Sequence, residues 1–193
     1  MNNYWTTRRT IRKYSNKEVT DKLLYNLIEK ASYAPTTGTM QLYSVIITRD
    51  AEQKAKITPA HFNQPASVNA PVLLTFCADF NRFTRWCMAS GANPAYANLQ
   101  SLMSAILDVT IFAQQFNTLA EMEGLGCCYL GTTLYNAPKI SETLGLPSLV
   151  LPVLTIAIGY PDEEGAKTYR LPVEAIIHSE KYRDESGEDI RTK

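Results

Sequence analysis

The chain has 193 residues, which is enough for one domain with a sizeable hydrophobic core. Its 19 basic and 19 acidic residues give a formal net charge of zero, so no global charge attracts the protein to nucleic acid or to an anionic membrane. We therefore expect a single domain over residues 1–193 with neither of these partners. Any anion-binding site in it must be a local cluster of cations.

The cysteines are not spaced as in a metal site or a disulfide framework. They are Cys77, Cys87, Cys127 and Cys128, and only two histidines could add imidazole ligands. The first twelve residues lack the apolar stretch of a signal peptide, and no apolar run is long enough to cross a bilayer. Free thiols without an export signal favour the cytoplasm.

The first half of the chain is expected to alternate between helices and strands. A helix is predicted over residues 20–34, with Thr20 as its N-cap. A β-branched strand over residues 43–48 follows, and then a helix over residues 51–57. Residues 72–78 form a continuous apolar run, which is typical of a central strand buried on both faces.

The second half contains the longest helical pattern. Apolar residues recur at spacings of three and four over residues 98–123, and the pattern ends at Gly124-Leu125-Gly126. Another buried strand is predicted over residues 153–159. Asp108 interrupts the apolar stripe, and we interpret it as a buried, hydrogen-bonded carboxylate at a helix contact. Helices outweigh strands, so we expect an α+β or three-layer α/β domain, with some apolar helix surface buried against a second copy.

Four segments carry residue types suited to a ligand. Residues 8–13 supply guanidinium groups, which match phosphate oxygens two at a time. Residues 35–41 form a loop of threonines and glycine with free N–H groups, and residues 124–132 are small enough for the backbone to approach a flat ring. Residues 167–172 add two cations. Taken alone, each segment is better explained by ordinary structure. In chain order, these structures are a basic turn, a helix-to-strand connection, a helix C-cap before a short strand, and an exposed basic loop.

No acid–base or nucleophilic constellation is visible in the sequence. It contains no Walker A loop, no Gly-x-Ser-x-Gly elbow and no His-Glu-x-x-His motif. We interpret His61 and His178 as structural or surface residues. An enzyme built on this chain therefore depends on a cofactor for its chemistry.

Taken in order, these segments resemble the nitroreductase family of FMN-dependent enzymes, and most closely its oxygen-insensitive nitroreductase and NADPH–flavin oxidoreductase branch. The similarity covers residues 8–182 and includes the opening Arg-Arg-Thr-Ile-Arg-Lys-Tyr together with residues 75–82, 108–131 and 144–163. It implies a three-layer nitroreductase-like fold, in which helices pack on a central, mostly antiparallel sheet. It also implies an intertwined homodimer with FMN at the subunit interface.

The resemblance further implies a set of FMN contacts. They fall into four sets: residues that hold the phosphate and ribityl chain, a loop that reaches over from the other subunit, a polar pair near the flavin pyrimidine, and a backbone stretch that faces the ring. In that order they are Arg8, Arg9, Thr10, Arg12, Lys167 and Arg170; Thr36 and Thr37; Asn63 and Gln64; and Tyr129, Leu130, Gly131 and Thr132.

The sequence departs from the family pattern at two of these places. Residues 39–43 read Thr-Met-Gln-Leu-Tyr where the family often has Asn-x-Gln-Pro-Trp, and two threonines follow Gly131 where a glycine pair is usual. The branch often carries a longer C-terminal extension whose arginines bind the NADPH 2′-phosphate, whereas this sequence ends at Lys193. The choice between NADH and NADPH stays open.

The function implied by the resemblance is that of an FMN-dependent NAD(P)H oxidoreductase. Hydride passes through flavin N5 to a flat acceptor, which is a nitroaromatic, a quinone or a flavin, in ping-pong fashion. No side chain is expected to be catalytic. One alternative is an FMN-binding protein that stores flavin, senses redox state or serves a partner, with little general reductase activity. Another is a different redox task, such as dehydrogenation or dehalogenation.

Overall fold

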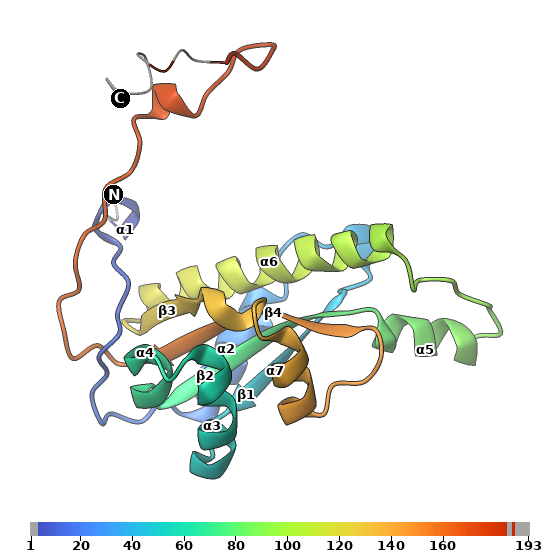
Figure 1. The fold of residues 1–193 in the computed structure, drawn as a ribbon, viewed down its shortest axis with the longest axis horizontal. Helices are drawn as coiled ribbons and strands as arrows, with labels where there is room; N and C mark the ends of the chain where they lie inside the picture. Colours follow the sequence, from blue (N-terminus) through green and yellow to red (C-terminus); the bar gives the residue numbers. More distant parts are fainter. Residues whose placement is uncertain (1–3, 185–186, 188–193) are drawn as a thin grey trace.

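A four-stranded sheet forms the middle layer of the computed structural model, which describes residues 4–184 and residue 187 (Figure 1). The strand order is β1-β2-β4-β3, and every neighbouring pair is antiparallel. The strands are β1 (Tyr43–Thr48), β2 (Val72–Asp79), β3 (Gly126–Leu130) and β4 (Val150–Gly159). The predicted α+β class and antiparallel central sheet are confirmed.

Helices cover both faces of this sheet, which confirms the three layers. One face carries α2 (Asp21–Ala31) and α6 (Leu99–Met122), and the other carries α3 (Ala51–Ile57), α4 (Pro65–Asn69) and α7 (Ala137–Leu144). Under α6, Phe76 of β2 packs edge-on against Phe112, with ring centroids 5.5 Å apart. On the other face of the sheet, Ile140 of α7 belongs to a hydrophobic cluster that includes Leu73 and Leu130.

Short elements complete the described chain. They are α1 (Tyr4–Thr7), α5 (Asn81–Ala89) and the 3₁₀ turns η1 (Thr37–Thr39), η2 (Thr58–His61), η3 (Gly131–Thr133) and η4 (Val173–Ala175). After β4 the chain runs beside the N-terminal segment and then extends away from the sheet (Figure 1). The N-terminal segment and the segment after β4 therefore lie at the same edge of the sheet.

The strongest sequence patterns are confirmed as elements. All eight residues of β2 are buried, as predicted for a central strand. α6 begins and ends within one residue of its predicted limits, and the Asn98 side chain caps it by accepting from the Ser101 N–H at 2.9 Å. β4 begins three residues before the predicted strand, at Val150.

The predicted end of the first helix is wrong. Thr20 caps α2 as predicted, accepting from the Leu23 N–H at 3.3 Å, but the helix ends at Ala31 instead of residue 34. The Ser32 hydroxyl bonds back to the Glu29 carbonyl at 2.7 Å. The residue before a proline is disfavoured in helical geometry, so Pro35 removes Ala34 from the helix.

The cysteines and histidines of the described chain show no arrangement for binding a metal ion. All four cysteines are free and buried, and within the described ranges no group of three or more His, Cys, Asp or Glu residues is arranged to hold a metal ion. His61 is fully buried, while His178 is exposed. Among the described residues, no helix has the length and apolar character needed to span a membrane.

Candidate functional site

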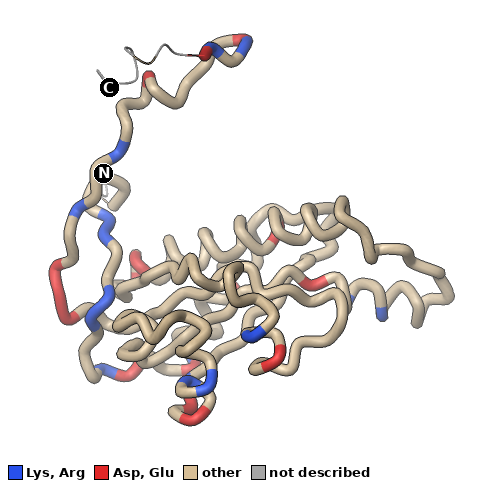
Figure 2. The backbone as a smooth tube through the Cα atoms, in the orientation of Figure 1, with Lys and Arg blue, Asp and Glu red and all other residues tan. Residues whose placement is uncertain are grey.

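The N-terminal segment is hydrogen-bonded to the segment that follows β4. Ser15 donates its N–H to the Tyr160 carbonyl at 2.9 Å, and Asp162 donates its N–H to the Lys13 carbonyl at 3.0 Å. The Glu163 carboxylate accepts the N–H groups of Arg12 and Lys13, and the first of these bonds is the main reason that the pKa of Glu163 lies below its usual range. Cations far apart in sequence thus reach the same edge (Figure 2).

Glycines permit this close approach. A Cβ at Gly126 would lie 2.6 Å from the Ile11 Cβ, which is closer than real side chains approach. Gly165 has a φ of +70°, and a Cβ there would lie 3.0 Å from the Thr10 carbonyl oxygen. Gly126 therefore accommodates the N-terminal segment, whereas a Cβ at Gly131 would meet nothing within 4 Å.

The predicted cations from the two chain ends share one pocket of about 500 Å³. It is lined by Trp5, Thr6, Arg8, Lys167, Thr168, Tyr169 and Arg170. Within this pocket an Arg170 Nη1–H bonds to the Thr168 hydroxyl at 2.6 Å and to the Tyr169 carbonyl at 2.9 Å. The structure therefore brings Lys167 and Arg170 together with Arg8.

Arg9, which follows Arg8 in the chain, has a side-chain donor without a partner. Its Nη1 donates to the Glu164 carbonyl at 3.2 Å, while its Nε is buried and has no hydrogen-bond partner among the described residues. A buried guanidinium donor without a partner is costly. Such a donor is suited to an anionic ligand.

Arg8 is already paired. Its Nη2 lies 3.0 Å from Oε1 of Glu121, whose side chain is only 8% exposed at the end of α6. The Tyr4 hydroxyl donates to the other carboxylate oxygen, and burial followed by this bond raises the pKa of Tyr4 to about 12. Part of the Arg8 charge is thus neutralised within the chain.

Hydrogen bonds also connect η2, which precedes the predicted polar pair, to the region of η3. His61 Nδ1 lies 3.0 Å from the Thr132 hydroxyl, and the Asn136 amide donates to the Ala60 carbonyl at 2.7 Å. Burial lowers the pKa of His61 to about 4, so its ring is neutral at physiological pH. These contacts place Asn63 and Gln64, which follow η2, beside η3.

β3 connects this region to the cations. It is the edge strand beyond β4, and the Ile11 N–H donates to its Cys127 carbonyl at 3.1 Å. Tyr129 points to the α6 side, where its hydroxyl donates to Gln114 at 3.2 Å, and burial is the main cause of its raised pKa. Most of the predicted contacts, those of residues 8–12, 63–64, 129–132 and 167–170, therefore lie around one edge of the sheet.

The predicted threonine loop lies far from the cation pocket, at another part of α6. Thr36 and Thr37 bond to Asp108, which is 2% exposed, and this confirms the predicted buried carboxylate. Arg8 meets the same helix at Glu121, which is about 20 Å further along the α6 axis. One chain alone does not bring this loop to the cation pocket.

Several residues at this site could not be predicted from the sequence. Glu121, Glu163 and Trp5 were not singled out, because contacts between distant segments leave no local periodicity. A histidine in front of the polar pair was visible, and its structural interpretation agrees with the complete burial of His61.

Residues 6–160 match the sequence model described as the nitroreductase family. The chain belongs to the nitroreductase family. The predicted family resemblance is therefore confirmed over most of the chain.

Relatives inside the nitroreductase family match nearly the whole chain. An FMN reductase [NAD(P)H] of Bacillus subtilis (strain 168) is 35% identical over 179 residues, which are 92% of this chain and 72% of the relative. A crystal structure from Bacteroides fragilis NCTC 9343 superposes with a TM-score of 0.94 and 54% identity, covering 96% of this chain and 75% of that one. The NADPH:FMN oxidoreductase from Vibrio harveyi, complexed with NAD⁺, gives a TM-score of 0.89 at 26% identity, covering 97% and 80%.

The residues of this nitroreductase-family chain fit FMN. The unpartnered Arg9 Nε and the pocket shared by Arg8, Lys167 and Arg170 suit a phosphate. The open space over Gly131 leaves room for a flat ring beside β3. The individual residue assignments stay predictions.

Proposed function

We propose that this protein is an FMN-dependent NAD(P)H oxidoreductase that reduces flat acceptors, namely nitroaromatics, quinones or flavins, by ping-pong hydride transfer. The proposal treats residues 1–193 as one FMN-binding domain. The observations that carry it are the buried, unpartnered Nε of Arg9 and the pocket that Arg8, the preceding residue, shares with Lys167 and Arg170. A phosphate would satisfy that donor and the neighbouring charges together.

In this proposal the side chains bind and orient the cofactor. Arg9, Arg12, Lys167 and Arg170 hold the phosphate, and Thr10 adds a hydroxyl. Asn63 and Gln64 bond to the pyrimidine edge, while the backbone from Tyr129 to Thr132 supports the ring. When bound, FMN supplies reversible hydride acceptance at N5.

The protein's contribution to rate is then mainly positional. Holding the donor and the flavin at reacting distance replaces a bimolecular encounter. The His61 ring contacts the Thr132 hydroxyl in η3. Because the pKa of His61 is lowered, its ring is neutral near pH 7 and has no proton to give as an acid. This supports a mechanism that needs no acid or base from that residue.

The proposal includes a homodimer. Leu99, Met103, Leu107 and Ile111 follow one another at every fourth position on α6, and they are 73%, 49%, 60% and 42% exposed. An apolar stripe of this length favours burial against a second copy. A second copy would also supply the threonine loop, which lies about 20 Å along α6 from Arg8 in its own chain.

Anaerobic titration of the FMN-loaded protein tests the proposal. NADH and NADPH are added separately, and the visible flavin band is followed before and after addition of a quinone. We expect at least one nucleotide to bleach the band and the quinone to restore it. Tight FMN binding without bleaching by either nucleotide would favour the storage or sensing role, and failure to bind FMN would reject both.

A further inference from the structure

The loop between α2 and β1 has an unfavourable backbone. Gly38, Thr39 and Gln41 have φ values of +54°, +59° and +50°, so all three lie in the left-handed region. Glycine adopts this region readily, but a β-branched residue such as Thr39 does so rarely and at a cost. The loop therefore needs contacts that hold its shape.

Asp108 of α6 provides the main contact. One of its carboxylate oxygens accepts the Thr37 N–H at 2.9 Å and the Thr37 hydroxyl at 2.7 Å. The other accepts the Thr36 hydroxyl and, at 3.3 Å, the Leu42 N–H. Four donors from one loop thus occupy the approximately four acceptor positions of a carboxylate.

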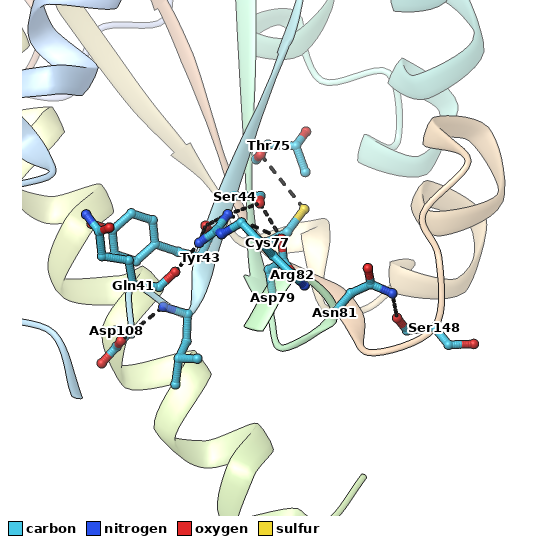
Figure 3. Close-up of polar contacts among 11 residues, drawn as sticks. Gln41, Tyr43, Ser44, Thr75, Cys77, Asp79, Asn81, Arg82, Asp108 and Ser148 are labelled. Carbon is cyan, nitrogen blue, oxygen red and sulfur yellow. Dashed lines mark hydrogen bonds and ion pairs between the residues drawn. The ribbon is translucent and has the colours of Figure 1, made fainter. Parts of the chain in front are cut away.

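Arg82 of α5 fixes the far end of the same loop (Figure 3). Its guanidinium donates to the carbonyls of Gln41 and Tyr43, the latter at 3.2 Å from both Nη atoms. Asp79, at the end of β2, lies 3.7 Å from the Arg82 Nη1 and so orients it. The loop is held between a helix of the core and the end of the central strand.

We propose that Asp108 is the positioning residue of this loop for the flavin, and that the hydroxyls of Thr36 and Thr37 serve Asp108 instead of donating to the cofactor. A hydroxyl has one proton to donate, and in both threonines Asp108 receives it. The exposed Gly38 and Thr39 are then the part of the loop that meets the flavin. This inference rests on the proposed FMN-dependent function.

A double-mutant cycle on FMN affinity separates the two roles of Thr37. The variants are Thr37→Val, Asp108→Asn and their combination, with FMN binding measured by quenching of flavin fluorescence. We expect each single change to weaken binding about tenfold. The double variant should bind about as weakly as Asp108→Asn alone, because the threonine acts through the aspartate. Thr37→Ser, which keeps the hydroxyl, should restore wild-type affinity.

Hydrogen exchange provides a second measurement that needs no cofactor. In the FMN-free protein, Asp108→Asn should speed amide exchange at Thr37 and Leu42, whose N–H groups bond to Asp108. Val19→Ala, a core truncation just before the Thr20 cap of α2, is the control for general destabilisation and should leave FMN affinity unchanged.

Each outcome bears on a separate claim. Multiplicative losses in the double variant would mean that Thr37 contacts the flavin directly, and would overturn the inference. Unchanged FMN affinity in Asp108→Asn would overturn it as well. Failure of the wild-type protein to bind FMN would instead reject the proposed function on which the inference rests.

Discussion

Arg8 and Arg12 stand in the same basic segment but have different surroundings. Arg8 is ion-paired with the largely buried Glu121, whereas Arg12 is exposed and uses only its backbone N–H to bind Glu163. A cation already neutralised within the chain offers less attraction to a phosphate. We therefore expect Arg12 to contribute more than Arg8 to phosphate binding, although it is Arg8 that lines the pocket with Lys167 and Arg170.

Arg12→Ala should lower FMN affinity by about 1.5–3 kcal/mol, the usual loss for a hydrogen bond to a charged group. Arg8→Ala should lower it less and should destabilise the fold, because Glu121 would keep a buried charge without its partner. Fluorescence titration with FMN and thermal unfolding measure the two effects. Lys22→Ala, which removes an exposed cation on α2, is the control. Equal affinity in Arg12→Ala and wild type would contradict the assignment.

His61 should make the fold sensitive to mild acid. Its pKa is about 4 in the folded protein and about 6.5 when unfolded, so the unfolded chain binds a proton first as the pH falls. Stability is then highest above pH 6.5 and declines between pH 6.5 and 4, by at most about 3 kcal/mol. Urea unfolding across this pH range should show that the free energy of unfolding falls less steeply in His61→Gln than in the wild-type protein. Parallel declines in the two proteins would rule out this source of acid sensitivity.

At the scale of elements, the glycine that begins β3 and the glycine that begins η3 have different roles. Gly126→Ala should destabilise the protein by about 2 kcal/mol, because the new methyl group would collide with Ile11 and displace the N-terminal segment. Gly131→Ala should change stability by less than about 0.5 kcal/mol, since nothing lies within 4 Å of the added atom. Thermal unfolding compares the two variants.

The same pair of glycine variants also tests the ring site. If the flavin ring lies over Gly131, Gly131→Ala should weaken FMN binding while the fold stays intact. A Gly131→Ala protein with wild-type affinity would place the ring elsewhere.

Elements with strong periodic patterns could be predicted from the sequence. The apolar spacing of residues 98–123 and the uninterrupted run in β2 correspond to α6 and to a fully buried central strand. The end of α2 was misplaced because a bond from Ser32 to Glu29 stops it before the proline does. β3 was only weakly indicated, since five residues between a glycine cap and a turn are too few for a periodic signal.

The cations of the candidate site could be predicted, but the carboxylates that hold them could not. Residues 8–12 and 167–170 were grouped by the family resemblance, and the structure brings Arg8, Lys167 and Arg170 to one pocket. The partners that hold this arrangement, Glu121 and Glu163, are fixed by tertiary contacts that no local pattern records. The threonine loop was read as a ligand-binding segment, while its bonds to Asp108 depend on helix packing.

At the scale of the whole molecule, the exposed stripe on α6 should decide the oligomeric state. Leu107→Glu places a charge in the middle of that stripe and should convert a dimer into monomers, because burying an unpaired charge is costly. Size-exclusion chromatography with light scattering measures the mass. FMN affinity should fall with it, since the second copy supplies the threonine loop.

Tyr25→Glu is the matched control for this change. Tyr25 lies on α2 and is 62% exposed, against 60% for Leu107, so the two substitutions are alike in exposure and charge. We expect the Tyr25 variant to remain dimeric. A Leu107→Glu protein with the mass of a dimer would show that α6 is not the interface.

The joining of the chain ends has a consequence for biosynthesis. The hydrogen bond from the Arg12 backbone N–H to the Glu163 carboxylate spans 151 positions, and Lys167 and Arg170 lie further still along the chain. A ribosome makes the N-terminal arginines first, yet their pocket cannot close until the last cations have emerged. A truncated or stalled product would carry the basic segment without a cofactor site. Acquisition of flavin would then mark a chain whose synthesis has passed Arg170.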